Sequence, residues 1–247
     1  MRAPDGLSVH TAAERPDLDE RADALTAEVW PEYNRHGNVM GEHWHVLSER
    51  WAAFQFVLVD EREALVAQGH MIPCRWDGTA DGLPDGIDAV MEQGASLAGE
   101  PNAASALAAE IRPRHQGRGL ARVMIETMVA ICRQHGLAHL IAPVRPSQKE
   151  RYPLIGIERY AAWTRPDGLP LDPWIRVHVR AGGRILRPAP RSLRISAPVT
   201  DWEAWTGLPL PGSGEYVFPH GLAPLSVDRE RGEGLYFEPN VWMAHPV

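Results

Sequence analysis

The stretch Ile111-Arg112-Pro113-Arg114-His115-Gln116-Gly117-Arg118-Gly119-Leu120-Ala121 joins an apolar, strand-like run to a glycine-rich turn and then to an amphipathic helix. Gly117 and Gly119 carry no Cβ, so the backbone can approach an anion closely there. The first amides of the following helix point toward such an anion and carry a partial positive charge. The turn therefore predicts a cradle for the pyrophosphate of a ligand.

Two better-known phosphate motifs do not fit these glycines. A dinucleotide fingerprint needs G-x-G-x-x-G, but Arg122 stands where its third glycine would allow close helix packing. A Walker loop needs Gly-Lys-Ser/Thr, and the only lysine of the chain is Lys149, far from the turn. An ordinary strand-to-helix turn without a ligand is the remaining alternative, and the strand before the turn and the helix after it count against that reading.

The segments around the turn have the patterns of regular elements. Residues 103–112 are apolar and predict a strand, and residues 120–135 place their apolar side chains on one helical face. Gly136 is a natural end for that helix. Residues 137–144 are almost all apolar, which is typical of a strand covered on both faces.

Gln116 to Ala121 fit the signature Gln/Arg-x-x-Gly-x-Gly/Ala, and on these residues the chain resembles the GCN5-related N-acetyltransferases (GNAT), as a member of the bacterial small-molecule type. The resemblance implies that acetyl-CoA or another acyl-CoA is the donor cosubstrate. It also implies that the backbone of Ile111 bonds the pantetheine arm or the thioester carbonyl and that amides from the turn bind pyrophosphate. The implied CoA-binding residues are Ile111, Arg112, Gln116, Gly117, Arg118, Gly119, Leu120, Ala121 and Arg122.

The resemblance covers about residues 7–198 and implies an α/β fold with a mixed, mostly antiparallel, splayed sheet flanked by helices. Beyond it the chain alternates strand-like and proline-rich pieces, with short strands expected at 184–187 and 192–196 and residues 223–227 paired with 235–237. Because apolar residues continue through these pieces, we expect one domain over residues 1–247, with a core at about 7–198 and a β-rich C-terminal extension at about 199–247.

The chain departs from the resembled family after Val144, where members have a helix carrying a tyrosine that protonates the departing thiolate. On one alignment that helix follows Asp172 and Pro173, which have the residue types of an N-cap and a first helical position, and His178 takes the place of the tyrosine. On the other, Ser147 opens the helix and Tyr152 is the acid. Glu110, at the end of a strand, is the candidate base, acting directly or through water.

Composition excludes several classes of function. A net charge of −7 argues against a broad basic surface for nucleic acid. The chain has no run of about 18 apolar residues and no apolar core of a signal peptide, so we expect no membrane association and a cytoplasmic location. The two cysteines, Cys74 and Cys132, are too few for a disulfide framework. His43 and His45 point to different sides of a helix, so no metal is expected.

These observations together predict an enzyme that transfers an acyl group, most simply acetyl, from CoA to the amine of a small molecule. The acceptor wall is expected to include Trp30, Tyr33, His43, His45 and Trp51, whose aromatic faces suit apolar or cationic groups. Three alternatives stay open: a carrier-protein donor, an aminoacyl-tRNA donor, and a non-catalytic acyl-CoA sensor. The sequence also leaves open a homodimer.

Overall fold

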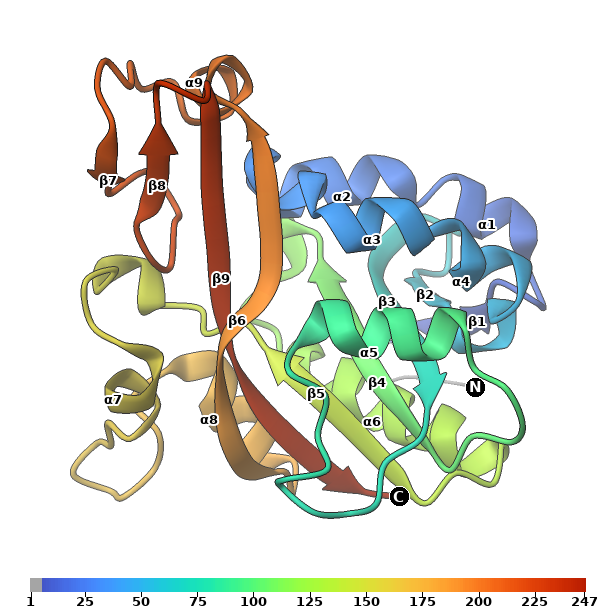
Figure 1. The fold of residues 1–247 in the computed structure, drawn as a ribbon. Coiled ribbons are helices and arrows are strands. Elements are labelled where there is room, and N and C mark those ends of the chain that lie inside the picture. Colours follow the sequence, from blue (N-terminus) through green and yellow to red (C-terminus); the bar gives the residue numbers. More distant parts are fainter. Residues whose placement is uncertain (1–5) are drawn as a thin grey trace.

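The computed structural model describes residues 6–247 and contains a nine-stranded sheet in that part of the chain (Figure 1). Its strands are β1 (Ser8–Thr11), β2 (Phe56–Val59), β3 (Leu65–Cys74), β4 (Ala103–Ile111), β5 (His139–Val144), β6 (Arg184–Pro198), β7 (Gly214–Tyr216), β8 (Leu225–Asp228) and β9 (Glu233–Pro246). The spatial order is β1-β2-β3-β4-β5-β9-β8-β7, with β6 paired to β9. Only the β4–β5 pairing is parallel. The expected mixed, mostly antiparallel α/β fold is confirmed.

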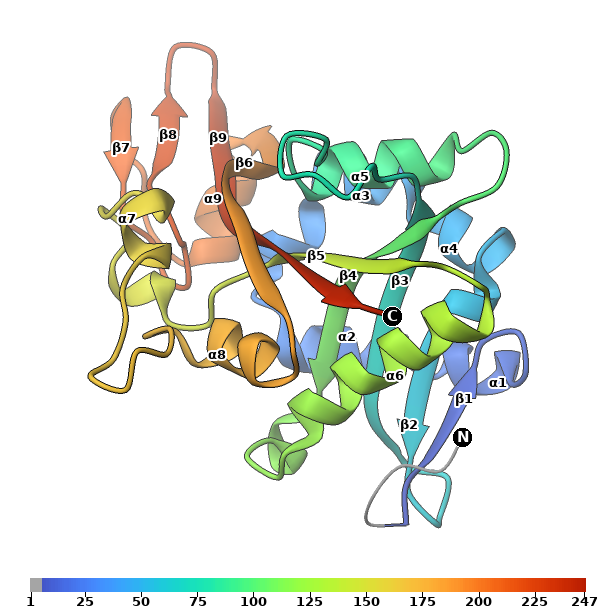
Figure 2. The same cartoon turned by 90° about the horizontal axis from the view of Figure 1, so that it is seen from below.

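The helices lie on both faces of this sheet. They are α1 (Pro16–Glu20), α2 (Asp23–Val29), α3 (Asn38–His43), α4 (His45–Glu49), α5 (Ile87–Ala95), α6 (Leu120–Gln134), α7 (Ile157–Ala161), α8 (Pro173–Arg180) and α9 (Val199–Thr206). Short 3-10 turns are η1 (Glu32–His36), η2 (Ala52–Phe54), η3 (Pro113–His115) and η4 (Lys149–Arg151). Figure 2 shows the sheet between α6 on one side and α5 on the other.

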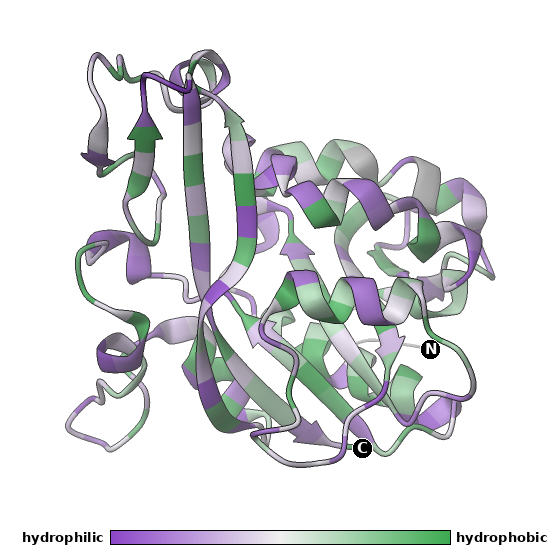
Figure 3. Ribbon diagram, viewed as in Figure 1, coloured by the Kyte–Doolittle hydropathy of each residue, from purple (hydrophilic) through white to green (hydrophobic). Residues whose placement is uncertain are grey.

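The alternation of side chains along a strand explains this layering. Phe56 and Leu58 of β2 pack with Met124 and Met128 of α6, whereas Val57 and Val59 face the opposite way and pack with α1. Five of the six residues of β5 are buried, and hydrophobic residues mark the central strands in Figure 3. The apolar run at 137–144 therefore forms a strand in the middle of the sheet, as its pattern predicts.

Strands β4 and β5 pair over only a short stretch and then diverge. Their register joins Ala103 to His139 and Ser105 to Ile141, after which no pairing between them continues in the described chain. From there β5 keeps its other partner, β9, as far as Val144. The sheet thus has a splay that begins beyond Ser105, at the carboxyl ends of two parallel strands.

The C-terminal strands are longer than the sequence predicts. The two short strands expected at 184–187 and 192–196 are one strand, β6, whose register shifts between Ala189 and Leu193. The pairing expected between 223–227 and 235–237 is present as β8 with the start of β9. However, β9 continues to Pro246 and pairs with the whole of β5. The expected extension therefore supplies a strand next to the splay.

Candidate active site

A cleft of about 1310 Å³ lies at the splay between β4 and β5. Its walls include the last six residues of β4 and residues 142–144 of β5. One end is formed by the glycine turn and the start of α6, with Ile111, Gln116, Gly117, Gly119, Leu120 and Ala121. Other parts of the lining, from other segments of the chain, are Trp30, Asn34, Trp44, Arg145, Glu238 and Asn240.

The glycine turn has the geometry of an anion cradle. Gly117 and Gly119 have φ values of +75° and +79°, which favour glycine, and a Cβ added at either position would meet nothing within 4 Å. The main-chain amides of residues 117–121 make no hydrogen bond to any residue of the described chain. Gln116 links the start of the loop to the end of β4, because its Nε2 donates to the carbonyl of Ile111 at 3.0 Å. Unbonded amides at the start of a fifteen-residue helix can bind phosphate oxygens.

Three arginines predicted for CoA binding lie outside the cleft lining. Arg112 Nε is 3.3 Å from Glu28 Oε2, and Arg122 Nε donates to Glu126 Oε1 at 2.7 Å. Arg118 lies beside His115, with 3.3 Å between Nη1 and Nδ1. Arg118 and Arg122 therefore border the turn on its outer side, where long side chains can reach a ligand that extends beyond the cleft.

Glu110 is buried in the cleft wall on β4, with 1% of its surface exposed. Its carboxylate accepts hydrogen bonds from Trp30 Nε1 at 2.7 Å, from Thr26 Oγ1 at 3.0 Å and from Gln68 Nε2. These donors come from α2, from the residue after it and from β3, and they fix the carboxylate at the mouth of the splay. A buried carboxylate on the cleft wall can hold an ammonium group or receive its proton.

His178 on α8 also lies in the cleft wall and is buried. Its Nδ1 is 2.9 Å from His245 Nε2, and its ring packs edge-on against Trp174. Burial, and then the neighbouring His245, lower the pKa of His178 to about 3, so the ring is uncharged at neutral pH. Its Nε2 has no hydrogen-bond partner among residues 6–247. One ring nitrogen of this cleft-lining residue is therefore buried without a partner in the described chain.

Tyr152 does not line the cleft. It is 39% exposed, and its ring packs against Tyr160 and Trp163. The alignment that makes it the acid needs a helix starting at Ser147, but the residues there form only the short turn η4. The helix after β5 that reaches the cleft is α8, where Asp172 caps the first turn by accepting from the amides of Trp174 and Ile175.

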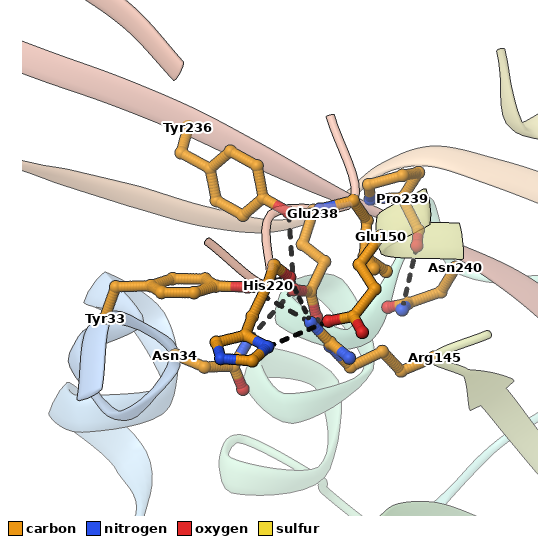
Figure 4. Close-up of polar contacts among 10 residues, drawn as sticks. Tyr33, Asn34, Arg145, Glu150, His220, Tyr236, Glu238, Pro239 and Asn240 are labelled. Carbon is orange, nitrogen blue, oxygen red and sulfur yellow. Dashed lines mark hydrogen bonds and ion pairs between the residues drawn. The ribbon is translucent and has the colours of Figure 1, made fainter. Parts of the chain in front are cut away.

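A network of polar contacts in the cleft wall is built around Arg145, the residue after β5. Its Nε is 3.1 Å from Glu238 Oε1, and its Nη2 donates to Tyr33 Oη at 3.1 Å and to the carbonyl of His220 at 2.9 Å (Figure 4). Glu238 also accepts from Asn34 Nδ2 at 3.0 Å. An ion pair between Arg145, directly after β5, and Glu238 of β9 therefore lies in the wall of the cleft.

Of the five residues expected to form the acceptor wall, one lines the cleft. Trp30 lines the cleft, whereas Tyr33 is buried in an aromatic cluster with Trp202, Phe218 and Tyr236. His43, His45 and Trp51 are outside the lining, and Trp44 takes that position from the same segment. Arg145 and Glu238 were not expected in the site. The position of Arg145, directly after a buried strand, could have indicated a site residue. Glu238 lies in an apolar segment, and nothing in the sequence around it indicates a functional role.

No group of three or more metal-binding side chains occurs in the described part of the chain. Within residues 6–247, no helix has the length and apolar character needed to cross a bilayer.

Comparison with known proteins gives a clear relative. The arginine N-acetyltransferase avaD of Aspergillus versicolor is 31% identical over 279 aligned positions, which cover 99% of this chain and 95% of that protein. No family model matches the chain. Among solved structures, the loading GNATL domain of CurA from Lyngbya majuscula aligns with a TM-score of 0.65 at 18% identity, covering 97% of both chains. The GphF GNAT-like decarboxylase in complex with isobutyryl-CoA aligns with a TM-score of 0.56 at 19% identity, covering 97% of this chain and 98% of that one.

Proposed function

Because the chain belongs to the GCN5-related N-acetyltransferase superfamily, we propose that it moves an acetyl group from acetyl-CoA to the amine of a small molecule, with arginine as the first candidate. The protein is an acyl-CoA-dependent N-acyltransferase, and acyl-CoA is its cosubstrate. The small-molecule acceptor and the residues that act on it are the proposal. Arginine comes first because the relative that matches nearly the whole chain is an arginine N-acetyltransferase.

The observation that carries the proposal is the row of unbonded amides at residues 117–121, where Gly117, Gly119, Leu120 and Ala121 line the cleft. These amides would hold the pyrophosphate of CoA at the start of α6. The pantetheine arm would then run into the splay, where the unpaired edges of β4 and β5 offer main-chain groups, including the amide of Ile111. The thioester would lie between Glu110 and His178, which line the same cleft.

The reaction needs few groups from the protein, because a thioester is already activated. The acceptor nitrogen attacks the carbonyl carbon, a C–N bond forms, and the C–S bond breaks with its electron pair leaving on sulfur. Glu110 would take the proton that the nitrogen loses, directly or through water. The thiolate takes its proton from solvent. His178, which is uncharged, would stabilise the sulfur before that step by donating a hydrogen bond from Nε2, in the tautomer that carries the proton there.

The lining of the cleft fits a cationic acceptor. Glu110 and Glu150 lie along it, besides Glu238, which is paired with Arg145, and the indole of Trp30 offers an aromatic face. Carboxylates at hydrogen-bond distance suit a guanidinium or ammonium group. The arginine candidate therefore rests on the charge of the cleft as well as on the relative.

The test is to incubate the purified protein with acetyl-CoA and arginine and to follow release of the CoA thiol, with the product identified by mass. A panel of other amines of similar length serves as comparison. Thiol release that depends on arginine supports the proposal. Tight CoA binding without thiol release for any small amine would overturn it.

A further inference from the structure

Arg145 has a donor edge that the protein does not use. Its Nε and Nη2 contact Glu238, Tyr33 and the carbonyl of His220. Its Nη1 donates to no residue in the described chain and is not one of the buried unpaired atoms. Because Arg145 lines the cleft, a guanidinium corner is available to a ligand there.

The contacts on the other edge hold this guanidinium rigidly. Tyr33 Oη donates to the carbonyl of His220 at 2.7 Å, and Asn34 Nδ2 fixes Glu238 from the opposite side (Figure 4). Three separate segments, η1, β9 and the loop at His220, therefore position one side chain before any ligand arrives. A preorganised donor of this kind binds an anion at low entropic cost.

A purely structural role does not account for the arrangement. An ion pair that only joined β5 to β9 would gain nothing from lining the cleft, and well-packed apolar residues often replace such pairs without loss of stability. Planar guanidinium groups are instead suited to carboxylates and phosphates. The pyrophosphate cradle is formed by other residues, those of the glycine turn, so a carboxylate is the anion that we assign to Arg145.

Trp30 places this guanidinium next to Glu110. The indole Nε1 donates to Glu110 Oε1 at 2.7 Å, and Arg145 Cζ lies 5.9 Å from the centre of the same ring. The indole of Trp30 thus has the carboxylate of Glu110 at its edge and the guanidinium of Arg145 near its face. A zwitterion with an ammonium group and a carboxylate a few bonds apart presents the complementary pair of charges.

We propose that Arg145 binds the carboxylate of an amino-acid acceptor through Nη1, while the acceptor's amine faces Glu110. This inference rests on the proposed acyl transfer and adds the class of acceptor, an amine that bears a carboxylate. Arg145 is then a specificity-determining residue, and Glu238, Tyr33 and Asn34 are positioning residues that keep its free edge in place.

The experiment compares arginine with agmatine, which is arginine without its carboxylate. For the unchanged protein, kcat/KM for arginine should exceed that for agmatine by about tenfold to a hundredfold, the effect of one charge-assisted hydrogen bond. The same comparison for lysine and cadaverine shows whether the preference follows the carboxylate.

Two variants connect this preference to Arg145. The double substitution Arg145→Gln with Glu238→Gln removes both charges, so no unpaired charge is left buried. Arg145→Lys keeps the pairing with Glu238 but removes the guanidinium fork. In both, the ratio of the two kcat/KM values should fall toward one, mostly through a higher KM for arginine. Arg231→Gln, an exposed ion-pair partner of Asp228, is the matched control and should keep the ratio.

The outcomes separate the two proposals. Equal use of arginine and agmatine by the unchanged protein, or an unchanged ratio in either folded variant, overturns the role of Arg145 and leaves acyl transfer intact. Binding of arginine to the CoA complex, measured by calorimetry, gives a second readout and should weaken in both variants. Absence of thiol release with every amine overturns the proposed function as well.

Discussion

Single residues of the glycine turn can be tested against a close control. Gly119→Glu places bulk and negative charge where the unbonded amides face the cleft, so we expect CoA affinity to fall at least about a hundredfold. The residue also has a φ of +79°, and loss of glycine there adds about 1 kcal/mol of strain. Isothermal titration with CoA measures the first effect, and thermal unfolding measures the second.

The matched control for this substitution is Gly136→Glu. Gly136 ends the same helix with a φ of +68°, and a Cβ there also meets nothing within 4 Å. The strain is therefore similar, but the position is at the far end of α6 from the cradle. If both variants lost CoA affinity equally, the cause would be destabilisation and the cradle would lie elsewhere.

His178 and Tyr152 are the two candidate acids, and their surroundings predict different results. His178→Ala removes a buried ring in the cleft wall and should lower kcat about tenfold to a hundredfold with little change in CoA affinity. Tyr152→Phe changes an exposed hydroxyl outside the lining and should leave kcat within about twofold. Steady-state rates over a range of acetyl-CoA concentrations measure both. Loss of rate in Tyr152→Phe alone would reverse the assignment.

Sequence reasoning finds residues of the site whose chemistry depends on local pattern. The glycines at 117 and 119 could be predicted because a turn before an amphipathic helix is a local feature. Arg145 and Glu238 could not, because their pairing joins two strands that are 93 positions apart along the chain and only the sheet brings them together. Glu110 was found as a strand-end carboxylate, but its three donors come from elements that the sequence does not place beside it.

At the scale of elements, α8 depends on one cap. Asp172 is 2% exposed and accepts from the amides of Trp174 and Ile175, from the amide of Gln148 and from the hydroxyl of Tyr160. Asp172→Ala should therefore lower the free energy of unfolding by about 3 kcal/mol, which combines a lost N-cap with buried donors left unpaired. Urea unfolding measures the change.

Asp172→Asn is the graded control for that substitution. Its amide oxygen can still cap Trp174 and Ile175, but its NH₂ group cannot accept from Gln148 or Tyr160. We expect it to lose about half as much stability as Asp172→Ala. Equal losses would mean that the cap contributes nothing and that the contacts to η4 and α7 hold the segment.

The sequence predicted helices and strands correctly where apolar residues recur with a clear period. It failed where pairing between strands far apart in the sequence determines the length of a strand. Helix α6 and strands β4 and β5 have the bounds that the sequence indicates, within two residues. Strand β6 contains three prolines after Leu186, which are typical of a break, yet pairing with β9 holds it as one strand with a register shift. The second half of β9 was not expected, because nothing local shows that it pairs with β5.

At the scale of the whole molecule, Lys149, the only lysine of the sequence, connects the segment after β5 to the C-terminal part of the chain. Lys149 is 1% exposed, and its Nζ donates to the carbonyls of Tyr152 at 2.8 Å and Leu222 at 2.6 Å. Burial lowers the pKa of Lys149 to about 8, below its value in the unfolded chain. Between about pH 8 and pH 10.4 the unfolded state binds more protons, so this residue makes stability rise with pH across that window.

The variant Lys149→Met tests this linkage. It cannot titrate, so its unfolding free energy should lack that rise, which amounts to at most about 1.4 kcal/mol per pH unit. Urea unfolding at pH 8, 9 and 10 gives the slope for both proteins. Parallel slopes would show that Lys149 has its ordinary pKa in the folded protein.

We propose that residues 1–247 fold as one domain, because the last strand is internal to the sheet. The second half of β9 pairs with the whole of β5, and Trp242 of β9 is fully buried with Cys74 of β3 and Ala103 of β4. The C-terminal segment therefore cannot leave without exposing the centre of the sheet.

Cys74 and Cys132 are fully buried on the N-terminal side, and Lys149 is buried against Leu222 of the C-terminal part. In increasing urea, a thiol reagent and an amine reagent should label them with the same midpoint, as expected for a single cooperative transition. If Lys149 became reactive at a clearly lower urea concentration than the two thiols, residues from about 199 onward would unfold separately, and the single-domain proposal would be wrong.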